Sequence, residues 1–312
     1  MNIEADSKVA LVFPGQGAQC ADMLSAFEAA PSYGRLRAHL AQRLGCDPLR
    51  GEGELNDNRV ASLLTVTASL LALELWRQAH PNAVIAGLAG YSVGQWTALY
   101  AAGCFEEETL FEVISQRARF MDEACAAGPP GGMVSVIGVP LGDIKHCCAR
   151  ARAQGFDVFL ANDNAPNQVT LAGQLGALSA LKDIIAPLRP KQIRDIPVAG
   201  AWHSPAMAPA AARFERYLMG VTLRAPTLPI IDNVSGLAFK NKPAAHDLAR
   251  QVAEPVLWQG CVRALISLGA TQVIEMGHGN ILTKFGFFID RSVKHVAVSP
   301  PPRLRPTLAA AQ

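Results

Sequence analysis

Charged residues are scarce in this sequence, and no block of basic residues stands out. Charged side chains make up 17% of the 312 residues, and the formal net charge is +2. Proteins that bind nucleic acid usually carry a concentrated basic face, so we expect no nucleic acid partner. Half of the residues are hydrophobic, which is typical of a globular chain, long enough for one large domain or for a large and a small one.

Long apolar runs are missing as well. A membrane-spanning helix needs about 18 or more consecutive, mainly apolar residues, and we find no run of that length, so we expect no membrane partner. The first residues (MNIEADSK) are polar and acidic, unlike the charged and then apolar start of a secretion signal. These features predict a cytoplasmic protein.

Cysteines are present, but not in a pattern that indicates a disulfide framework or a metal site. Their number is odd, there is no Cys-x-x-Cys pair, and no histidine lies at zinc-ligand spacing. We interpret them as reduced, mostly buried small residues, and we expect no metal. They are Cys20, Cys46, Cys104, Cys125, Cys147, Cys148 and Cys261.

Short apolar runs that end in glycine-rich turns indicate buried strands. Residues 9–13 (VALVF) end at Pro14-Gly15 and fit a central parallel strand, and residues 83–89 lead into a Gly-Tyr-Ser-Val-Gly turn. A long packed helix is predicted over 61–79, another near 256–268, and a further strand at 272–276. This alternation of strands and helices predicts an α/β fold with a parallel sheet.

Residues 131–198 have the pattern of a separate unit. Apolar runs and helical stretches follow one another there in a β-α-β-β-α-β order, which is typical of the ferredoxin-like arrangement. A Gly-Pro-Pro-Gly-Gly stretch marks its start and Ala199-Gly200 its end. We therefore predict a small ferredoxin-like domain at 131–198, inserted into a large α/β-hydrolase-like domain of residues 1–130 and 199–312. The proline-rich tail from residue 299 is expected to be loosely ordered.

The Gly90-Tyr91-Ser92-Val93-Gly94 turn fits a nucleophile elbow, in which a sharp strand-to-helix turn exposes a serine hydroxyl. The helix that follows places a positive dipole end and a free backbone N–H beside Ser92, both useful to a developing oxyanion. A serine hydroxyl needs a general base. The residues favour His203, in a loop between domain-like segments, over its competitor His278 in a glycine-rich turn.

Seven motifs in order along residues 9–286 resemble the malonyl-CoA:acyl carrier protein transacylases. They are FPGQGAQ (13–19), GYSVG (90–94), RARFM (117–121), GAWHSPAM (200–207), NVSG (233–236), PVLW (255–258) and EMGHGNILTKF (275–285). The resemblance implies an enzyme that moves a malonyl group from malonyl-CoA to an acyl carrier protein. It implies no cofactor beyond the coenzyme A thioester, which is itself the substrate.

The resemblance also implies roles by position. Ser92 would be the nucleophile and His203 the general base, later the acid. The backbone N–H groups of Gln16 and Val93 would form the oxyanion hole. A main-chain carbonyl holds the histidine in this family in place of an aspartate, and Gln251 occupies the matching position here.

Arg117 matches the arginine that receives the free carboxylate of the malonyl group. Its planar guanidinium can pair with a carboxylate through two parallel hydrogen bonds. Tyr91 and Trp202 depart from the residues usual in the family, and both are expected to line the acyl pocket. The bulk of Trp202 favours malonyl over methylmalonyl as the acyl group.

Other interpretations remain open on the sequence alone. The departures from the family pattern suggest a specialised relative, either an acyltransferase of a polyketide pathway or the malonyl transferase subunit of a malonate decarboxylase. A Gly-x-Ser-x-Gly motif with a histidine also describes esterases and thioesterases, although a hydrolase gains little from the carboxylate clamp of Arg117. A non-catalytic docking subunit is the remaining alternative.

Overall fold

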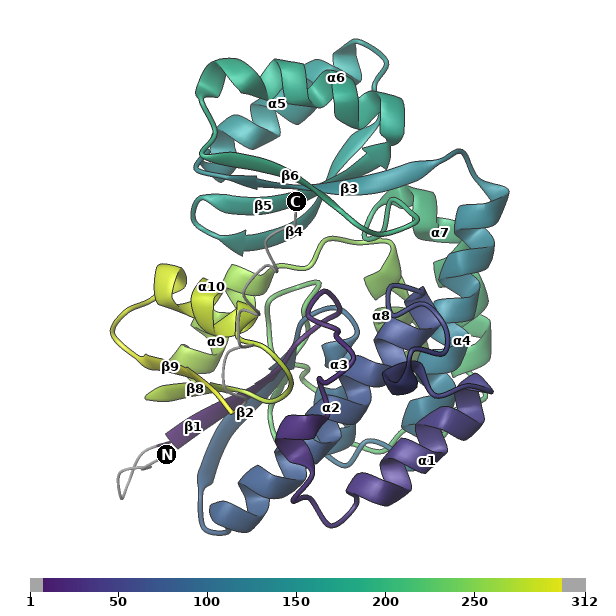
Figure 1. The fold of residues 1–312 in the computed structure, drawn as a ribbon. Helices are drawn as coiled ribbons and strands as arrows, with labels where there is room; N and C mark the ends of the chain where they lie inside the picture. The colour runs from purple at the N-terminus through teal and green to yellow at the C-terminus, as the bar shows by residue number, and fades with distance from the viewer. Residues whose placement is uncertain (1–7, 299–312) are drawn as a thin grey trace, which may run out of the picture.

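Five parallel strands form the larger of two sheets in the computed structural model, which describes residues 8–298 (Figure 1). Their order is β7-β2-β1-β8-β9, so the strand predicted to be central is central. The tail predicted from residue 299 and the acidic start lie outside the described residues. The strands are β1 (Lys8–Phe13), β2 (Val84–Gly90), β7 (Ile230–Ile231), β8 (Gln272–Glu275) and β9 (Lys294–Ala297).

Helices cover both faces of this sheet, as the side-chain alternation of a strand requires. Val9, Leu11 and Phe13 of β1 join the apolar cluster of α2, α3 and α4, whereas Ala10 and Val12 join that of α9 and α10. The result is a three-layer α/β arrangement. Its helices are α1 (Tyr33–Leu44), α2 (Asn58–Ala79), α3 (Gly94–Ala101), α4 (Glu107–Ala127), α7 (Ala208–Leu218), α8 (Ala245–Ala249), α9 (Trp258–Ser267) and α10 (Ile281–Ile289), with 3-10 turns at Ser25–Phe27, Pro48–Arg50, Pro205–Met207 and Arg250–Val252.

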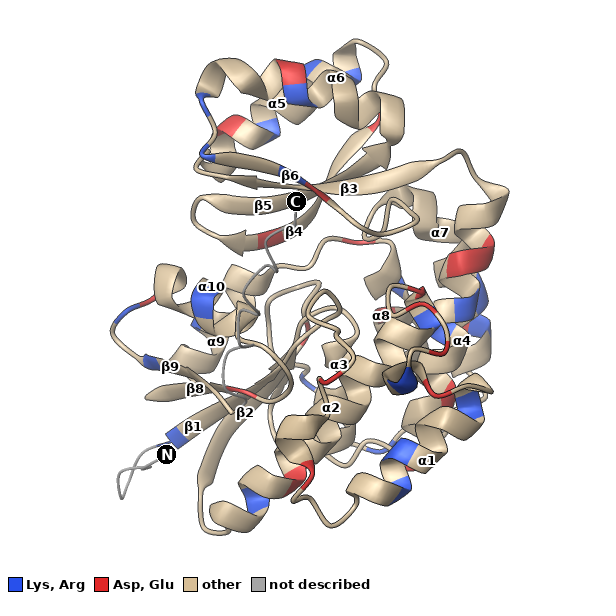
Figure 2. Cartoon of the chain, viewed as in Figure 1, with Lys and Arg blue, Asp and Glu red and all other residues tan. Residues whose placement is uncertain are grey.

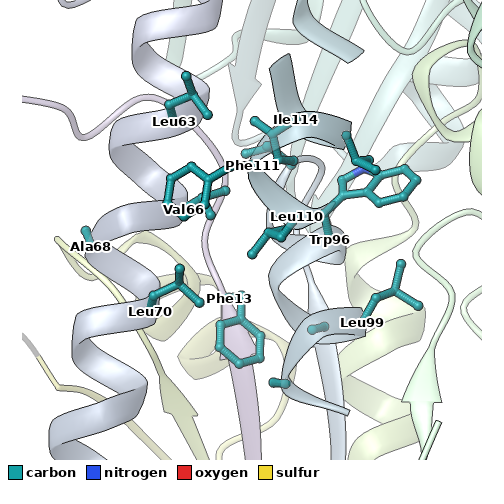
Figure 3. Packing of buried hydrophobic residues seen from close by; sticks show 14 of the residues in the cluster. Phe13, Leu63, Val66, Ala68, Leu70, Trp96, Leu99, Leu110, Phe111 and Ile114 are labelled. Carbon is teal, nitrogen blue, oxygen red and sulfur yellow. The ribbon is translucent and has the colours of Figure 1, made fainter. Parts of the chain in front are cut away.

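Helix α2 is the core of the large part. It begins after Asp57, whose carboxylate accepts a hydrogen bond from the backbone N–H of Val60 at 3.0 Å and so caps the helix. Side chains such as Leu63 and Val66 lie close to Phe111 of α4 (Figure 3). The helix is long and apolar enough to cross a membrane, contrary to our expectation from the sequence, but 83% of its most apolar stretch is buried inside the protein. A helix that is apolar on all sides is typical of such a buried position.

The second sheet is antiparallel and has four strands in the order β4-β5-β3-β6, with α5 and α6 packed on one face (Figure 1). Along the chain its elements run β-α-β-β-α-β. A backbone hydrogen bond connects it to the large part, because the backbone N–H of Asp163 in β4 donates to the carbonyl of Val256 at 2.9 Å. The elements are β3 (Gly131–Ile137), α5 (Leu141–Ala153), β4 (Val158–Ala165), β5 (Gln168–Gln174), α6 (Leu175–Ile185), a 3-10 turn at Ala186–Leu188 and β6 (Gln192–Ile196).

The seven cysteines form no disulfide. Cys104, Cys147, Cys148 and Cys261 are buried, and the other three are partly exposed. Burial raises the thiol pKa of all four buried cysteines, so these side chains stay neutral and act as small apolar residues.

Candidate active site

Ser92 lies at the sharp turn between β2 and α3. Its backbone φ is +50°, a left-handed conformation that is uncommon for a residue with a side chain. The flanking glycines make this turn possible. A Cβ atom on Gly90 would lie 2.0 Å from the carbonyl carbon of Gly94, and one on Gly94 would lie 2.1 Å from the carbonyl oxygen of Phe13. The Gly-x-Ser-x-Gly spacing thus follows from backbone packing.

His203 is the histidine that reaches Ser92. It lies in the loop between β6 and α7, and its Nε2 atom is 2.8 Å from the Oγ atom of Ser92. Its Nδ1 atom faces two main-chain carbonyls, that of Gln251 at 2.8 Å and that of Glu254 at 3.2 Å. A carbonyl can only accept, so Nδ1 carries the proton and Nε2 is left to accept the hydroxyl proton of Ser92.

The environment keeps this imidazole neutral. His203 is buried, with 3% of its surface exposed. Burial, and after it the positive charge of Arg117, lowers the pKa of His203 to about 4. The side chain is therefore an unprotonated base at neutral pH, which is the state that activates a serine hydroxyl.

Arg117 extends from α4 to the same serine. Its guanidinium is almost fully buried, and its Nη2 atom donates a hydrogen bond to the Oγ atom of Ser92 at 3.2 Å. Burial lowers its pKa to about 10, so it remains charged at neutral pH. Its Nη1 atom has no hydrogen-bond partner within residues 8–298. A buried cation with an unused donor favours an anionic ligand group.

The side chain of Gln251 joins these groups. Its Oε1 atom accepts a hydrogen bond from Nε of Arg117 at 3.2 Å, and its Nε2 atom donates to the carbonyl of Ser92 at 2.7 Å. The sequence had assigned only the main-chain carbonyl of Gln251, which holds His203. Gln251 thus contacts Ser92, His203 and Arg117. No signal in the sequence indicated the role of its side chain.

Gln16 and Val93 lie where an oxyanion hole is expected. Gln16 follows β1, and its side-chain amide donates to Oδ1 of Asn58 at 3.0 Å and Oγ of Ser62 at 2.9 Å, which fixes its loop against α2. Val93 is the residue before α3. The backbone N–H groups of both residues have no acceptor in the described part of the chain. They can therefore donate to an incoming oxygen.

A cleft of about 560 Å³ contains Ser92 and His203 and lies between the two sheets. The loops after β1, β2 and β8 contribute to its walls, as expected for the carboxyl ends of strands in an open α/β sheet. Tyr91 and Trp202 both line it. The hydroxyl of Tyr91 donates to Oδ1 of Asn164 on β4 at 2.7 Å, so the elbow is linked directly to the small sheet.

His278, the competing histidine, also lines the cleft but does not contact Ser92. Its Nε2 atom lies 3.3 Å from the Sγ atom of Cys20. Burial lowers its pKa. Residues 8–298 contain no group of three or more His, Cys, Asp or Glu side chains arranged to hold a metal ion. The structure brings together a serine, a neutral histidine, two free backbone N–H groups and a buried guanidinium from distant segments of the chain.

Comparison with known proteins agrees with this chemistry. The family model of the acyl transferase domain matches residues 51–285. The malonyl CoA-acyl carrier protein transacylase of Escherichia coli is 32% identical over 284 residues, 89% of this chain and 91% of that protein.

Two solved structures share the fold over nearly the whole chain. The acyl-carrier-protein S-malonyltransferase of Burkholderia pseudomallei has a TM-score of 0.86 and 32% identity, over 94% of this chain and 97% of that one. A malonyl-transacylase in complex with a type II polyketide synthase acyl-carrier protein has a TM-score of 0.84 and 29% identity, over 93% of this chain and 95% of that one. The chain thus belongs to the acyl transferase family and, within it, to the malonyl-CoA:acyl carrier protein transacylases.

Proposed function

We propose that this protein transfers a malonyl group from malonyl-CoA to the phosphopantetheine thiol of an acyl carrier protein, through an ester on Ser92. The observation that carries the proposal is the buried guanidinium of Arg117, 3.2 Å from the Ser92 hydroxyl. A cation held so close to the nucleophile selects an acyl group that ends in a carboxylate. The reaction serves fatty acid or polyketide biosynthesis.

In the first half-reaction the Oγ atom of Ser92 attacks the thioester carbonyl while Nε2 of His203 takes its proton. The negative oxygen of the tetrahedral intermediate accepts hydrogen bonds from the backbone N–H groups of Gln16 and Val93. The carbon–sulfur bond then breaks, and the imidazolium returns the proton to the departing coenzyme A thiol. The carbonyls of Gln251 and Glu254 stabilise the imidazolium meanwhile.

In the second half-reaction the thiol of the carrier protein attacks the ester on Ser92. His203 takes the thiol proton and gives it back to the Oγ atom of Ser92 as the ester bond breaks. Two sequential transfers through one covalent intermediate predict ping-pong kinetics. All of these proton transfers use groups of the chain, so the proposed mechanism needs neither a metal nor a nucleotide cofactor.

Selection of the acyl group rests on Arg117. A malonyl carboxylate paired with its guanidinium satisfies a buried charge, whereas an acetyl group leaves that charge unpaired. Gln251 holds the guanidinium in place through Nε. Tyr91 and Trp202 restrict the cleft near the serine, and the bulk of Trp202 disfavours the extra methyl group of methylmalonyl. We further propose that the protein acts in the cytoplasm.

The direct test measures transfer of the malonyl group from malonyl-CoA to a holo acyl carrier protein, by recording the intact mass of the carrier. Wild type is expected to add one malonyl group to the carrier, and Ser92→Ala to add none. Ser267→Ala, which changes an exposed serine of α9, is the control and should behave as wild type. Release of free malonate at the same rate with and without carrier would identify a hydrolase and refute the proposal.

A further inference from the structure

Asp232, directly after β7, is a buried acidic residue that takes no part in the proposed mechanism. Figure 2 shows that the charged residues lie mainly on helices and loops, and few on the strands of the large sheet. Within residues 8–298 the buried charged residues are Arg117, Asp232 and Glu275. Arg117 contacts Ser92, and Glu275 accepts hydrogen bonds from the first turn of α10. A buried charge is costly unless it is paired, so the partner of Asp232 indicates its role.

That partner is Arg250, the first residue after α8. Its Nη2 atom lies 3.2 Å from Oδ2 of Asp232, and its Nη1 atom lies 3.1 Å from Oε2 of Glu254. The side chain of Asp232 is 7% exposed and that of Arg250 is 28% exposed, so solvent screens this pair less than it screens a surface pair. The planar guanidinium thus connects the end of β7 to the segment that follows α8.

The segment that begins with Arg250 holds the base. Nδ1 of His203 faces the carbonyls of Gln251 and Glu254, at 2.8 and 3.2 Å. The backbone N–H of His203 donates to the carbonyl of Val252 at 2.9 Å. Carbonyls of one short segment therefore fix both the ring and the backbone of the base, and a shift of this segment would move the imidazole.

The loop that begins with Asp232 holds the nucleophile elbow. The carboxylate of Asp232 accepts hydrogen bonds from two backbone N–H groups of this loop, at 3.1 and 3.2 Å. The next residue, Asn233, is fully buried, and its Nδ2 atom donates to the carbonyl of Gly90 at 2.9 Å. Its backbone N–H donates to Oε1 of Gln95 in α3 at 3.2 Å. The loop thus contacts the chain on both sides of Ser92.

We propose that the ion pair of Asp232 and Arg250 positions the base against the nucleophile. It connects the loop that holds the elbow to the segment that holds His203, and the 2.8 Å distance from Nε2 of His203 to Oγ of Ser92 depends on both. Neither Asp232 nor Arg250 lines the cleft, so both are positioning residues. The inference rests on the proposed function, because it concerns the serine and histidine that form the acyl ester.

This arrangement differs from a Ser-His-Asp triad, in which the carboxylate orients the histidine directly. Here the carboxylate of Asp232 acts indirectly, through the guanidinium of Arg250 and the main-chain carbonyls that follow it. Such a role predicts an effect on the reaction of Ser92 with any ester, whether or not its acyl group carries a charge.

The test measures the rate at which p-nitrophenyl acetate acylates Ser92. This ester is neutral and has no carboxylate for Arg117, so the rate depends on the serine and its base. A displacement of about 1 Å can lower a rate about a hundredfold. We expect Arg250→Met to lower the acylation rate about tenfold or more, and Asp232→Asn about threefold or more. Both substitutions break the same ion pair, so the double variant should be no slower than Arg250→Met.

Arg37→Met is the matched control. Arg37 lies 3.0 Å from Asp47, with side chains 33% and 19% exposed, and neither residue lines the cleft. Both methionine variants lose a partly buried Arg–Asp pair, but only Arg250→Met should slow the acylation. Far-UV circular dichroism at the assay temperature verifies that each variant is folded. Arg250→Lys, which keeps a cation near Asp232, should recover part of the rate.

Proton NMR gives a second measurement that a loss of stability alone would not change. The Nδ1 proton of His203 is held by two carbonyls and should give a downfield resonance in wild type. Arg250→Met should move this resonance upfield, and Arg37→Met should leave it in place.

A folded Arg250→Met protein that is acylated at the wild-type rate would overturn the positioning role. So would losses in Asp232→Asn and Arg250→Met that multiply in the double variant, because the two residues would then act independently. If Arg250→Met is unfolded at the assay temperature, the rates of Arg250→Lys and Asp232→Asn decide, and wild-type rates in both would overturn the role. Failure of wild type to react at Ser92 would instead refute the proposed function.

Discussion

The Oγ atom of Ser92 and the Nε2 atom of His203 lie 2.8 Å apart, and both residues have a left-handed backbone, with φ of +50° and +57°. Such a conformation costs about 1–3 kcal/mol for a residue with a side chain, so the surrounding structure must hold it. The backbone N–H of His203 donates to the carbonyl of Val252 at 2.9 Å, and Gln251 binds the carbonyl of Ser92. The segment around Gln251 therefore supports both members of the pair.

The pH dependence of acylation should show the depressed pKa of His203. Burial and then Arg117 lower this pKa to about 4, so the base is lost only as the pH falls through about 4. The rate at which p-nitrophenyl acetate, a neutral ester, acylates Ser92 should be constant from pH 8 to about 5 and fall below that. An acid limb near 6.5, the ordinary value for histidine, would contradict this account.

Removal of Arg117 should move that acid limb. Arg117→Ala takes away a positive neighbour, so the pKa of His203 rises and the limb shifts to higher pH with the same neutral ester. Burial remains the larger cause, so the limb should stay below 6.5. Arg119→Ala changes an exposed arginine two residues further along α4 and should leave the profile where it is.

Gln251→Ala tests a positioning role. The variant loses the side-chain hydrogen bonds to Arg117 and to the carbonyl of Ser92, but it keeps the main-chain carbonyl that holds His203. Hydrogen bonds to charged groups contribute about 1.5–3 kcal/mol, so kcat/KM for malonyl-CoA should fall about tenfold or more. The malonyl-over-acetyl preference should fall as well, while the acid limb of the pH profile stays in place. Gln154→Ala, at an exposed position, is the control, and an unchanged acyl preference in Gln251→Ala would show that its side chain does not orient Arg117.

Gly90→Ala tests the packing of the elbow. The added methyl group would lie 2.0 Å from the backbone of Gly94, so the turn must open. We expect a loss of about 3 kcal/mol or more in the free energy of unfolding, measured with urea. Gly34→Ala in α1 meets no atom within 4 Å, and it should change stability by about 1 kcal/mol or less, toward greater stability. Equal effects of the two variants would exclude the packing explanation.

Tyr91→Phe tests the link between the elbow and the small sheet. The variant leaves Oδ1 of buried Asn164 without the hydroxyl donor, which should cost about 1–3 kcal/mol of unfolding free energy. Tyr100→Phe is the control, because the hydroxyl of Tyr100 makes no hydrogen bond within residues 8–298. A Tyr91→Phe protein as stable as this control would mean that the hydrogen bond contributes nothing.

The sequence predicted the central strands well because they are buried on both faces. The expected strands at 9–13, 83–89 and 272–276 differ from β1, β2 and β8 by one residue or less at each end. The edge strand β9 and helix α10 were not predicted. β9 is short and polar at its start, whereas α10 is apolar and carries phenylalanines on its exposed face, so hydrophobic periodicity does not identify either element.

The sequence predicted the residues of the candidate site but not the hydrogen bonds that connect them. The family motifs located Ser92, His203 and Arg117, and the structure brings all three together. The side chain of Gln251 contacts Arg117 and Ser92, which lie 134 and 159 residues earlier in the sequence. Such contacts depend on the tertiary structure, and no local pattern of residue types records them. The Tyr91–Asn164 contact between the elbow and β4 was missed for the same reason.

In the proposed mechanism, Ser92 carries a malonyl group that Arg117 selects. The most direct measurement incubates the protein with malonyl-CoA, acetyl-CoA and methylmalonyl-CoA in competition and records its intact mass. We predict a malonyl adduct in wild type, no adduct in Ser92→Ala, and loss of the malonyl-over-acetyl preference in Arg117→Ala. An adduct that persists in Ser92→Ala, or a malonyl preference that survives in Arg117→Ala, would contradict the account.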